Sequence, residues 1–273
     1  MKKGLFFTLF LCFCGSAIAQ IITKSIDSKI LNAKRSISIK LPDTYDQASN
    51  IKHPVIVVLD GDFLYNPVVG QTDFQTYFKK MPASIVVGIN HGDMRVADNL
   101  FNKVSGLPED SGAEFYGFIR EELLAYIDEN YNTNNFRVVV GYEKSVNLMN
   151  SFLLEEQPLF QAYVNLSPEY NDAMSQNIVD RIQRLNEDVI YYMTSAKTNV
   201  EDIATNLTSV KNMLSNIDNA YFKFYFDNFK EVPHHTLVMR GMAHGFEKVF
   251  DVYKPSLDRK RNDKLLSYEN ILD

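Results

Sequence analysis

The chain has 273 residues, of which 45% are hydrophobic, and a formal net charge of −6 at pH 7. This length and composition predict one large domain with a sizeable buried core. The acidic balance argues against nucleic acid or an anionic membrane surface as a partner.

The first 19 residues have the features of a secretory signal peptide. A basic start precedes an apolar run, and Ala17 and Ala19 stand before an expected cut at Gln20. The apolar run is too short to span a bilayer, and no later segment is apolar enough to do so. Both cysteines, Cys12 and Cys14, lie inside this segment, so the exported chain would have no disulfide. We therefore expect a periplasmic or secreted protein.

Apolar, β-branched segments alternate with helical patterns through the rest of the chain, residues 20–273. We expect strands at 35–42, 55–59, 83–90, 136–142, 160–168, 188–196 and 221–229. We expect helices at 113–131, 145–157 and 234–253. Strands that are apolar on both faces predict a single α/β domain, with a mostly parallel central sheet and helices on both faces. Residues 91–112 are predicted to form a long loop over the carboxyl edge of the sheet, where ligands bind in such folds.

The stretch RVVVGYEKSVNLMNSFLL, residues 137–154, reads as an apolar strand, a sharp turn and a helix. In α/β-hydrolases this connection carries the motif G-x-S-x-G, with the nucleophilic serine at the tip of the turn. Here the five positions from Gly141 to Ser145 read G-Y-E-K-S. Glu143 therefore stands where the serine is expected, on a turn that Gly141 and Ser145 are small enough to allow.

Several segments, in order, resemble the putative-esterase family of α/β-hydrolases, which includes siderophore esterases, S-formylglutathione hydrolases and mycolyltransferases. The segments are PVIVVLDGD, IVVGINHGDMR, FYGFIREELLAYIDENYNTNNFRVVVG, LFQAYVNLSPEY and HHTLVMRGMAHGFEKVF. Arg95 matches the arginine that follows the family's V-G-I strand, and His235 and Gly245 keep the family's spacing. The resemblance implies the α/β-hydrolase fold, an esterase-type site and an ester-like small-molecule ligand.

The resemblance also implies a catalytic group made of Glu143, His235 and an acid. The family's acid position falls nearest Asn199, and Glu201 or Asp202 is the candidate substitute. The same acids are equally expected as residues that stabilise the start of a helix. His234 is adjacent to His235 and could exchange roles with it.

Backbone N–H groups of Lys144 and of the loop at Gly61 and Asp62 are predicted to form an oxyanion-type pocket, with Arg95 in the same site. Glu143, His235 and Asp62 are the side chains that could converge on a metal ion. Their spacing matches no metal-binding motif, so no metal and no other cofactor is expected.

Three interpretations of Glu143 remain open. It could be a carboxylate nucleophile, or a general base that activates water together with His235. Alternatively, serine chemistry is lost, and the site binds a ligand or a protein partner or is a relic. We favour this last interpretation, because acyl transfer without the serine hydroxyl keeps only a residual rate. Ser145 is predicted to lie in the first helical turn and to face elsewhere.

Overall fold

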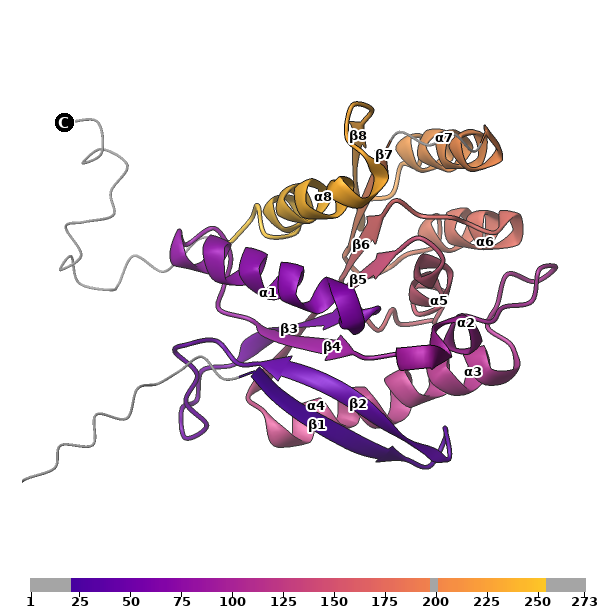
Figure 1. Cartoon of the computed structure of the whole chain (residues 1–273). Helices are drawn as coiled ribbons and strands as arrows, with labels where there is room; N and C mark the ends of the chain where they lie inside the picture. Colours follow the sequence, from indigo (N-terminus) through magenta and orange to yellow (C-terminus); the bar gives the residue numbers. More distant parts are fainter. Residues whose placement is uncertain (1–20, 197–200, 254–273) are drawn as a thin grey trace, which may run out of the picture.

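The computed structural model describes residues 21–196 and 201–253, except for the side chains of residues 201–203 and 234. Within these residues an eight-stranded sheet has the order β1-β2-β4-β3-β5-β6-β7-β8 (Figure 1). The strands are β1 (Ile21–Ser28), β2 (Ala33–Lys40), β3 (His53–Val58), β4 (Ile85–Ile89), β5 (Thr133–Tyr142), β6 (Ala162–Leu166), β7 (Val189–Ala196) and β8 (Phe222–Phe229). Strands β3 to β8 are parallel, whereas β1 and β2 are antiparallel to their neighbours. The predicted mostly parallel sheet is confirmed.

Helices pack on both faces of this sheet (Figure 1). One face is covered by α1 (Gly61–Tyr77) and α8 (His234–Val249). The other face carries α3 (Asp110–Gly117), the π-helix η2 (Phe118–Leu123), α4 (Leu124–Asn130), α5 (Ser145–Ser151), α6 (Asp172–Ile182) and α7 (Glu201–Ser215). A short 3-10 helix, η1 (Gly92–Met94), and α2 (Arg95–Asp98) precede α3.

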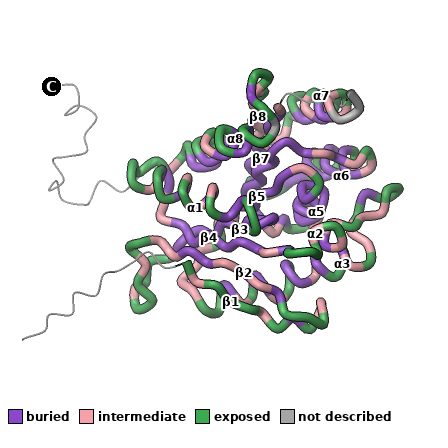
Figure 2. Tube along the Cα trace, viewed as in Figure 1, coloured by how far each residue is buried: buried purple, intermediate pink, exposed green. Residues whose placement is uncertain are grey.

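The sheet separates two clusters of buried apolar side chains, because successive residues of a strand point to opposite faces. In β3, Val55 and Val57 join the cluster beneath α3 to α7, while Ile56 and Val58 join the cluster beneath α1 and α8. Every residue of β3, β4 and β6 is buried. Figure 2 shows the central strands buried and much of the sheet edge at β1 exposed.

Four predicted segments differ from the structure. The helix expected at 234–253 ends at Val249. Residues 91–112 are not a plain loop, because η1, α2 and the start of α3 lie within them. The helix expected at 145–157 ends at Ser151, and the chain then continues in tight turns with bonds such as Leu153 N–H to Asn150 O. The helix expected at 113–131 begins earlier, at Asp110, and is interrupted by the π-helix.

Candidate functional site

The candidate site lies where the carboxyl ends of β3 and β5 pass into α1 and α5. These two strands are parallel neighbours, so their strand-to-helix turns meet at one edge of the sheet. Asp60 directly precedes α1 with φ of 58°, and Glu143 forms the tip of the turn before α5 with φ of 52°. The left-handed region is disfavoured for such residues by about 1–2 kcal/mol. Strain of this kind gathers at functional sites.

The turn at Glu143 is bonded to the end of β6 and to the loop that follows it. Its backbone N–H donates to Leu166 O at 3.1 Å, and its carbonyl accepts from Glu169 N–H at 3.3 Å. A Cβ on Gly141 would lie 3.0 Å from the sulfur of Met149, so the position two residues before the tip needs a glycine or a local shift. The predicted sharp turn with Glu143 at its tip is therefore present.

Ser145 lies in the first turn of α5 and is fully buried. Its Oγ donates to Asp60 Oδ2 at 2.7 Å and accepts from Tyr142 N–H at 3.0 Å. The hydroxyl thus links the two turns from beneath. It faces away from the open side of the elbow, as its place in the first helical turn predicts.

A network of side-chain contacts links Asp60 through Arg95 and His91 to Asp98 at the end of α2 and to Arg35 in β2. Arg95 Nε donates to Asp60 Oδ1 at 2.5 Å, and His91 Nε2 lies 3.7 Å from the same oxygen. His91 Nδ1 lies 2.6 Å from Asp98 Oδ2. Arg35 donates two hydrogen bonds to the Asp98 carboxylate, from Nη1 to Oδ2 at 2.7 Å and from Nη2 to Oδ1 at 2.8 Å. The side chains of Asp60 and His91 have no exposed surface. Buried charges of this kind are tolerated only when they are paired.

Sequence reasoning placed Arg95 in the site but missed most of this network. The side chains of Asp60, Asp98 and Arg35 had no assigned role, and His91 was expected to be an ordinary loop residue, with lining of the pocket as the alternative. One available signal was that Arg95 and Asp98 lie three residues apart, which is the spacing of one helix face. Treating residues 91–112 as a loop concealed that signal.

Arg95 reaches from this network toward the elbow. Its guanidinium lies over the ring of Phe63, 5.6 Å from the centroid. Burial lowers the pKa of Arg95. The hydrogen bond to Asp60 and the negative charges of Asp60 and Glu143 together raise the pKa by more than burial lowers it, so the net change is upward. Arg95 therefore stays a cation that offsets the carboxylate of Glu143.

Tyr142 connects Glu143 with His235. Burial raises the pKa of Tyr142, and a hydrogen bond to the Glu143 carboxylate raises it further. The Tyr142 hydroxyl also lies 3.4 Å from Nδ1 of His235, which is exposed in the first turn of α8. The ring of Phe63 meets Tyr142 edge-on at 6.0 Å. Glu143 and His235, both predicted as site residues, therefore share the Tyr142 hydroxyl.

The remaining predicted site residues have different surroundings. Gly61 opens α1 against β4, where a Cβ would lie 2.7 Å from Ile89 O. The carboxylate of Asp62 accepts the backbone N–H groups of His91, at 2.7 Å, and Gly92, at 3.3 Å. Lys144 follows the tip and is exposed. These contacts place Gly61 and Asp62 beside the network.

The residues predicted to supply the catalytic acid have no described side chains. Glu201 is the first residue of α7, and its side chain and that of Asp202 are not described. Asn199 lies outside the described residues. Helix α7 begins at Glu201, and the role of this residue in stabilising the helix start stays a prediction.

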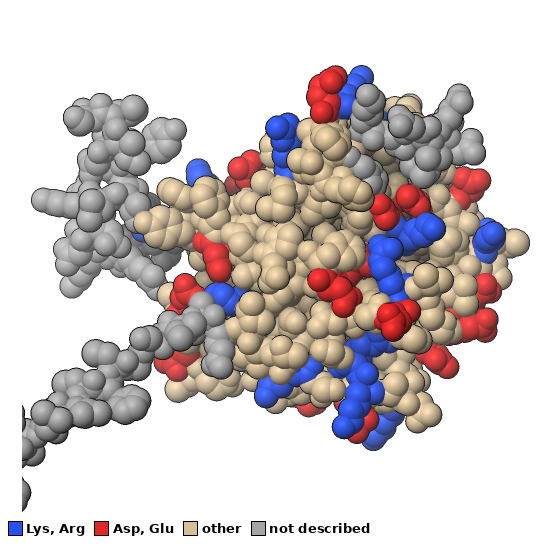
Figure 3. All heavy atoms as spheres, in the orientation of Figure 1, with Lys and Arg blue, Asp and Glu red and all other residues tan. Residues whose placement is uncertain are grey.

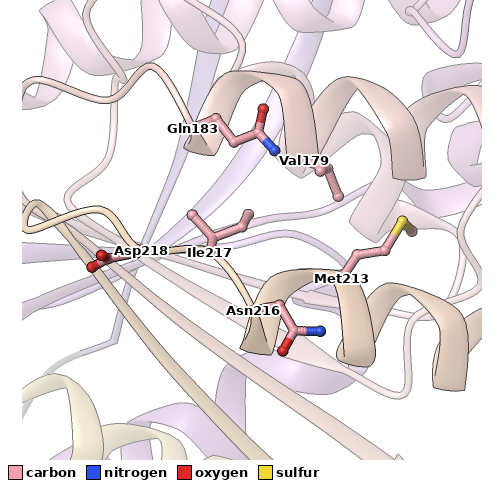
Figure 4. Close-up of a pocket in the computed structure, with 6 residues that line it drawn as sticks. All are labelled: Val179, Gln183, Met213, Asn216, Ile217 and Asp218. Carbon is pink, nitrogen blue, oxygen red and sulfur yellow. The ribbon is translucent and has the colours of Figure 1, made fainter.

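Among described residues, no group of three or more His, Cys, Asp or Glu side chains could hold a metal ion. A cavity of about 530 Å³ lies between α6 and α7 (Figure 4). It is lined by Val179, Gln183, Met213, Asn216, Ile217 and Asp218. Both helices end there, so the cavity lies toward the opposite edge of the sheet from Glu143. In the part of the chain that is described, no helix has the length and apolar character to cross a membrane.

The chain is similar to known esterases. Residues 28–143 match the family described as putative esterase. An uncharacterised protein from Capnocytophaga ochracea is 27% identical with a TM-score of 0.80, over 86% of this chain and 65% of that protein. An IroE-like serine hydrolase from Shewanella oneidensis is 20% identical with a TM-score of 0.76, over 86% of this chain and 82% of that one.

A more distant structure has the same fold. The siderophore hydrolase EstB from Aspergillus nidulans is 12% identical with a TM-score of 0.67, over 86% of this chain and 96% of that one. No curated protein matches the sequence. The likenesses confirm the predicted α/β-hydrolase fold.

Proposed function

We propose that this chain is an exported, esterase-like protein that lacks ordinary serine-esterase activity and binds an ester-like small molecule at its elbow. The observation that carries the proposal is Glu143 at the tip of the turn, with φ of 52°. Ser145 cannot replace a tip serine, because it is buried and bound to Asp60. A nucleophile must instead be exposed at the tip and reach the carbonyl carbon.

The surroundings of Glu143 favour a stable carboxylate over a reactive one. Arg95 supplies a nearby cation, and Tyr142 hydrogen-bonds the carboxylate. Ester hydrolysis places a developing oxyanion in the pocket formed by backbone N–H groups. A second negative charge beside that pocket opposes the oxyanion electrostatically, so Glu143 favours binding of a neutral ester-like group over its cleavage.

Export is the part of the proposal that rests on sequence alone. Residues 1–19, which carry the signal-peptide features, lie outside the described residues. Sequencing the N-terminus of protein recovered from the periplasm or the medium should give Gln20 as the first residue. Recovery of the whole chain in the cytoplasm, with Met1 or Lys2 first, would contradict export.

A second candidate is an active ester or acyl hydrolase that uses Glu143 with His235. The contact between Tyr142 and both side chains favours it, because a hydroxyl between a carboxylate and an imidazole can relay a proton. This candidate requires turnover that disappears when Glu143 is removed.

A serine-reactive fluorophosphonate probe separates the two candidates from a serine hydrolase. The native protein and Glu143→Ala should remain unlabelled, and Glu143→Ser should become labelled if the surrounding pocket is intact. Labelling of the native protein would show that it has a reactive serine and would contradict the proposal. A Glu143→Ser protein that folds but stays unlabelled would contradict an intact ester-binding pocket.

A further inference from the structure

The outer side of α1 carries a stripe of apolar positions that remains open in the described structure. The positions recur every three or four residues, which is the spacing of one helix face. Phe63, Phe74 and Phe78 are 46%, 61% and 49% exposed. Figure 3 shows mostly uncharged surface over this helix. The α1 stripe consists of Phe63, Pro67, Gly70, Phe74, Tyr77 and Phe78.

Two residues of the stripe disfavour the helix that contains them. Relative to alanine, a helix interior is destabilised by about 1 kcal/mol by glycine and about 3 kcal/mol by proline. A Cβ on Gly70 would meet nothing within 4 Å, so the described fold does not require a glycine there. A bare backbone between aromatic side chains does allow another element to approach α1 closely.

The aromatic end of the stripe is already organised. The rings of Phe74 and Phe78 are 5.0 Å apart, and those of Tyr77 and Phe78 are 5.1 Å apart. Lys79 follows in the left-handed conformation, with φ of 56°, and its N–H donates to Thr76 O at 3.0 Å. This cap fixes the end of α1, so the rings present a preformed apolar surface.

The described chain ends beside this surface. Helix α8 packs next to α1, and Gln75 Nε2 donates to Ala243 O at 2.9 Å. Figure 1 shows the end of α8 beside the C-terminal end of α1. Phe250 and Tyr253 pack on the same core cluster as α1. Beyond Tyr253 the sequence continues with KPSLDRKRNDKLLSYENILD.

We propose that residues 265–272 of this same chain dock on the α1 stripe. Leu265, Tyr268 and Leu272 recur at positions i, i+3 and i+7, so a helix would present them on one face. The twelve residues from Tyr253 to Leu265 can span about 40 Å, whereas α1 is about 26 Å long. Every position of the stripe is therefore within reach, at the high effective concentration of an intramolecular contact.

This inference does not depend on the proposed function, because it rests on α1 and the sequence after Tyr253.

The chain contains no tryptophan, so a single introduced indole reports on the stripe. Phe74→Trp in the full chain should emit at a shorter wavelength than an exposed indole, with acrylamide quenching reduced at least twofold. Adding Leu265→Lys and Leu272→Lys should shift the emission to longer wavelength and restore quenching. The matched reporter is Val104→Trp, at a position 89% exposed in a distant loop, and it should not respond to the two lysines.

Two results would overturn the proposal. An indole at position 74 that is equally quenched with and without the two lysines would show that the segment does not cover the stripe. A short-wavelength emission that appears only as protein concentration rises would assign the stripe to a second copy of the chain. Circular dichroism of each variant checks that the fold is retained.

Discussion

Ser145 donates a hydrogen bond to Asp60 across the two turns that frame the elbow, with 2.7 Å between Oγ and Oδ2. The two residues come from different strand-to-helix connections, and both are fully buried. The bond joins the turn before α1 to the turn before α5, and the other oxygen of Asp60 accepts from Arg95. The serine nearest the elbow tip is therefore structural, and the open side of the turn belongs to Glu143.

Ser145→Ala should lower the free energy of unfolding by about 1.5–3 kcal/mol, because a buried carboxylate loses a hydrogen-bond donor. Urea-induced unfolding measures the change. Ser151→Ala is a matched control in the same helix, where the buried hydroxyl bonds the neutral carbonyl of Asn147 at 3.2 Å. That control should lose about 0.5–1.5 kcal/mol. Equal losses would show that the bond to the Asp60 carboxylate stabilises the fold no more than the bond to the neutral carbonyl of Asn147.

Glu143→Gly should be more stable than Glu143→Ala by about 1 kcal/mol, because φ of 52° is strained for alanine and relaxed for glycine. Both variants lose the carboxylate and its contacts, so their difference isolates the backbone. Denaturant midpoints of the two proteins provide the measurement. If the alanine variant matches the glycine variant, the elbow is not held in the left-handed conformation.

Asp98→Asn should destabilise the protein by about 3–5 kcal/mol, because Arg35 would keep a buried charge without its carboxylate. The matched control is Asp128→Asn, which breaks an ion pair with Arg137 near the surface. Such an exposed pair contributes up to about 1 kcal/mol. Thermal and urea unfolding should therefore separate the two variants clearly, and similar values for both would contradict a buried network.

Alkaline pH should weaken the fold through its buried tyrosines. Burial raises the pKa of Tyr163 and Tyr191 well above the ordinary value. Above about pH 10 these groups lose their protons in the unfolded chain but keep them in the folded one. The unfolded state then binds fewer protons, so stability present below pH 10 falls as pH rises further.

The loss should reach about 1.4 kcal/mol per pH unit for each such tyrosine. Unfolding free energies at pH 9, 10 and 11 test this, with Tyr163→Phe as the comparison. The variant should lose stability less steeply above pH 10 than the native protein. Parallel slopes for the two proteins would contradict the burial argument for Tyr163.

The central strands could be predicted because burial on both faces requires continuous apolar sequence. The runs at β3 and β4 contain no polar alternation, and the structure buries every one of their residues. The elbow was also predictable, since an apolar strand followed by small residues and a helix defines the turn around Glu143. The order of apolar and small residues within one segment was sufficient to predict these strands and this turn.

Features that depend on contacts between distant segments were not predictable in this way. Helix α1 contains Pro67 and Gly70, which weaken a helical pattern, and its stability comes from packing of Leu64 and Val68 on the sheet. The pair of Arg35 and Asp98 joins residues 63 positions apart. Sequence spacing alone could not show that this pair is buried.

Hydrolysis of short-chain p-nitrophenyl esters tests the central claim most directly. The purified native protein and Glu143→Ala should show no turnover above background, and Glu143→Ser should gain it through the intact pocket and His235. Turnover by the native protein that disappears in Glu143→Ala would contradict the account and make Glu143 a catalytic residue.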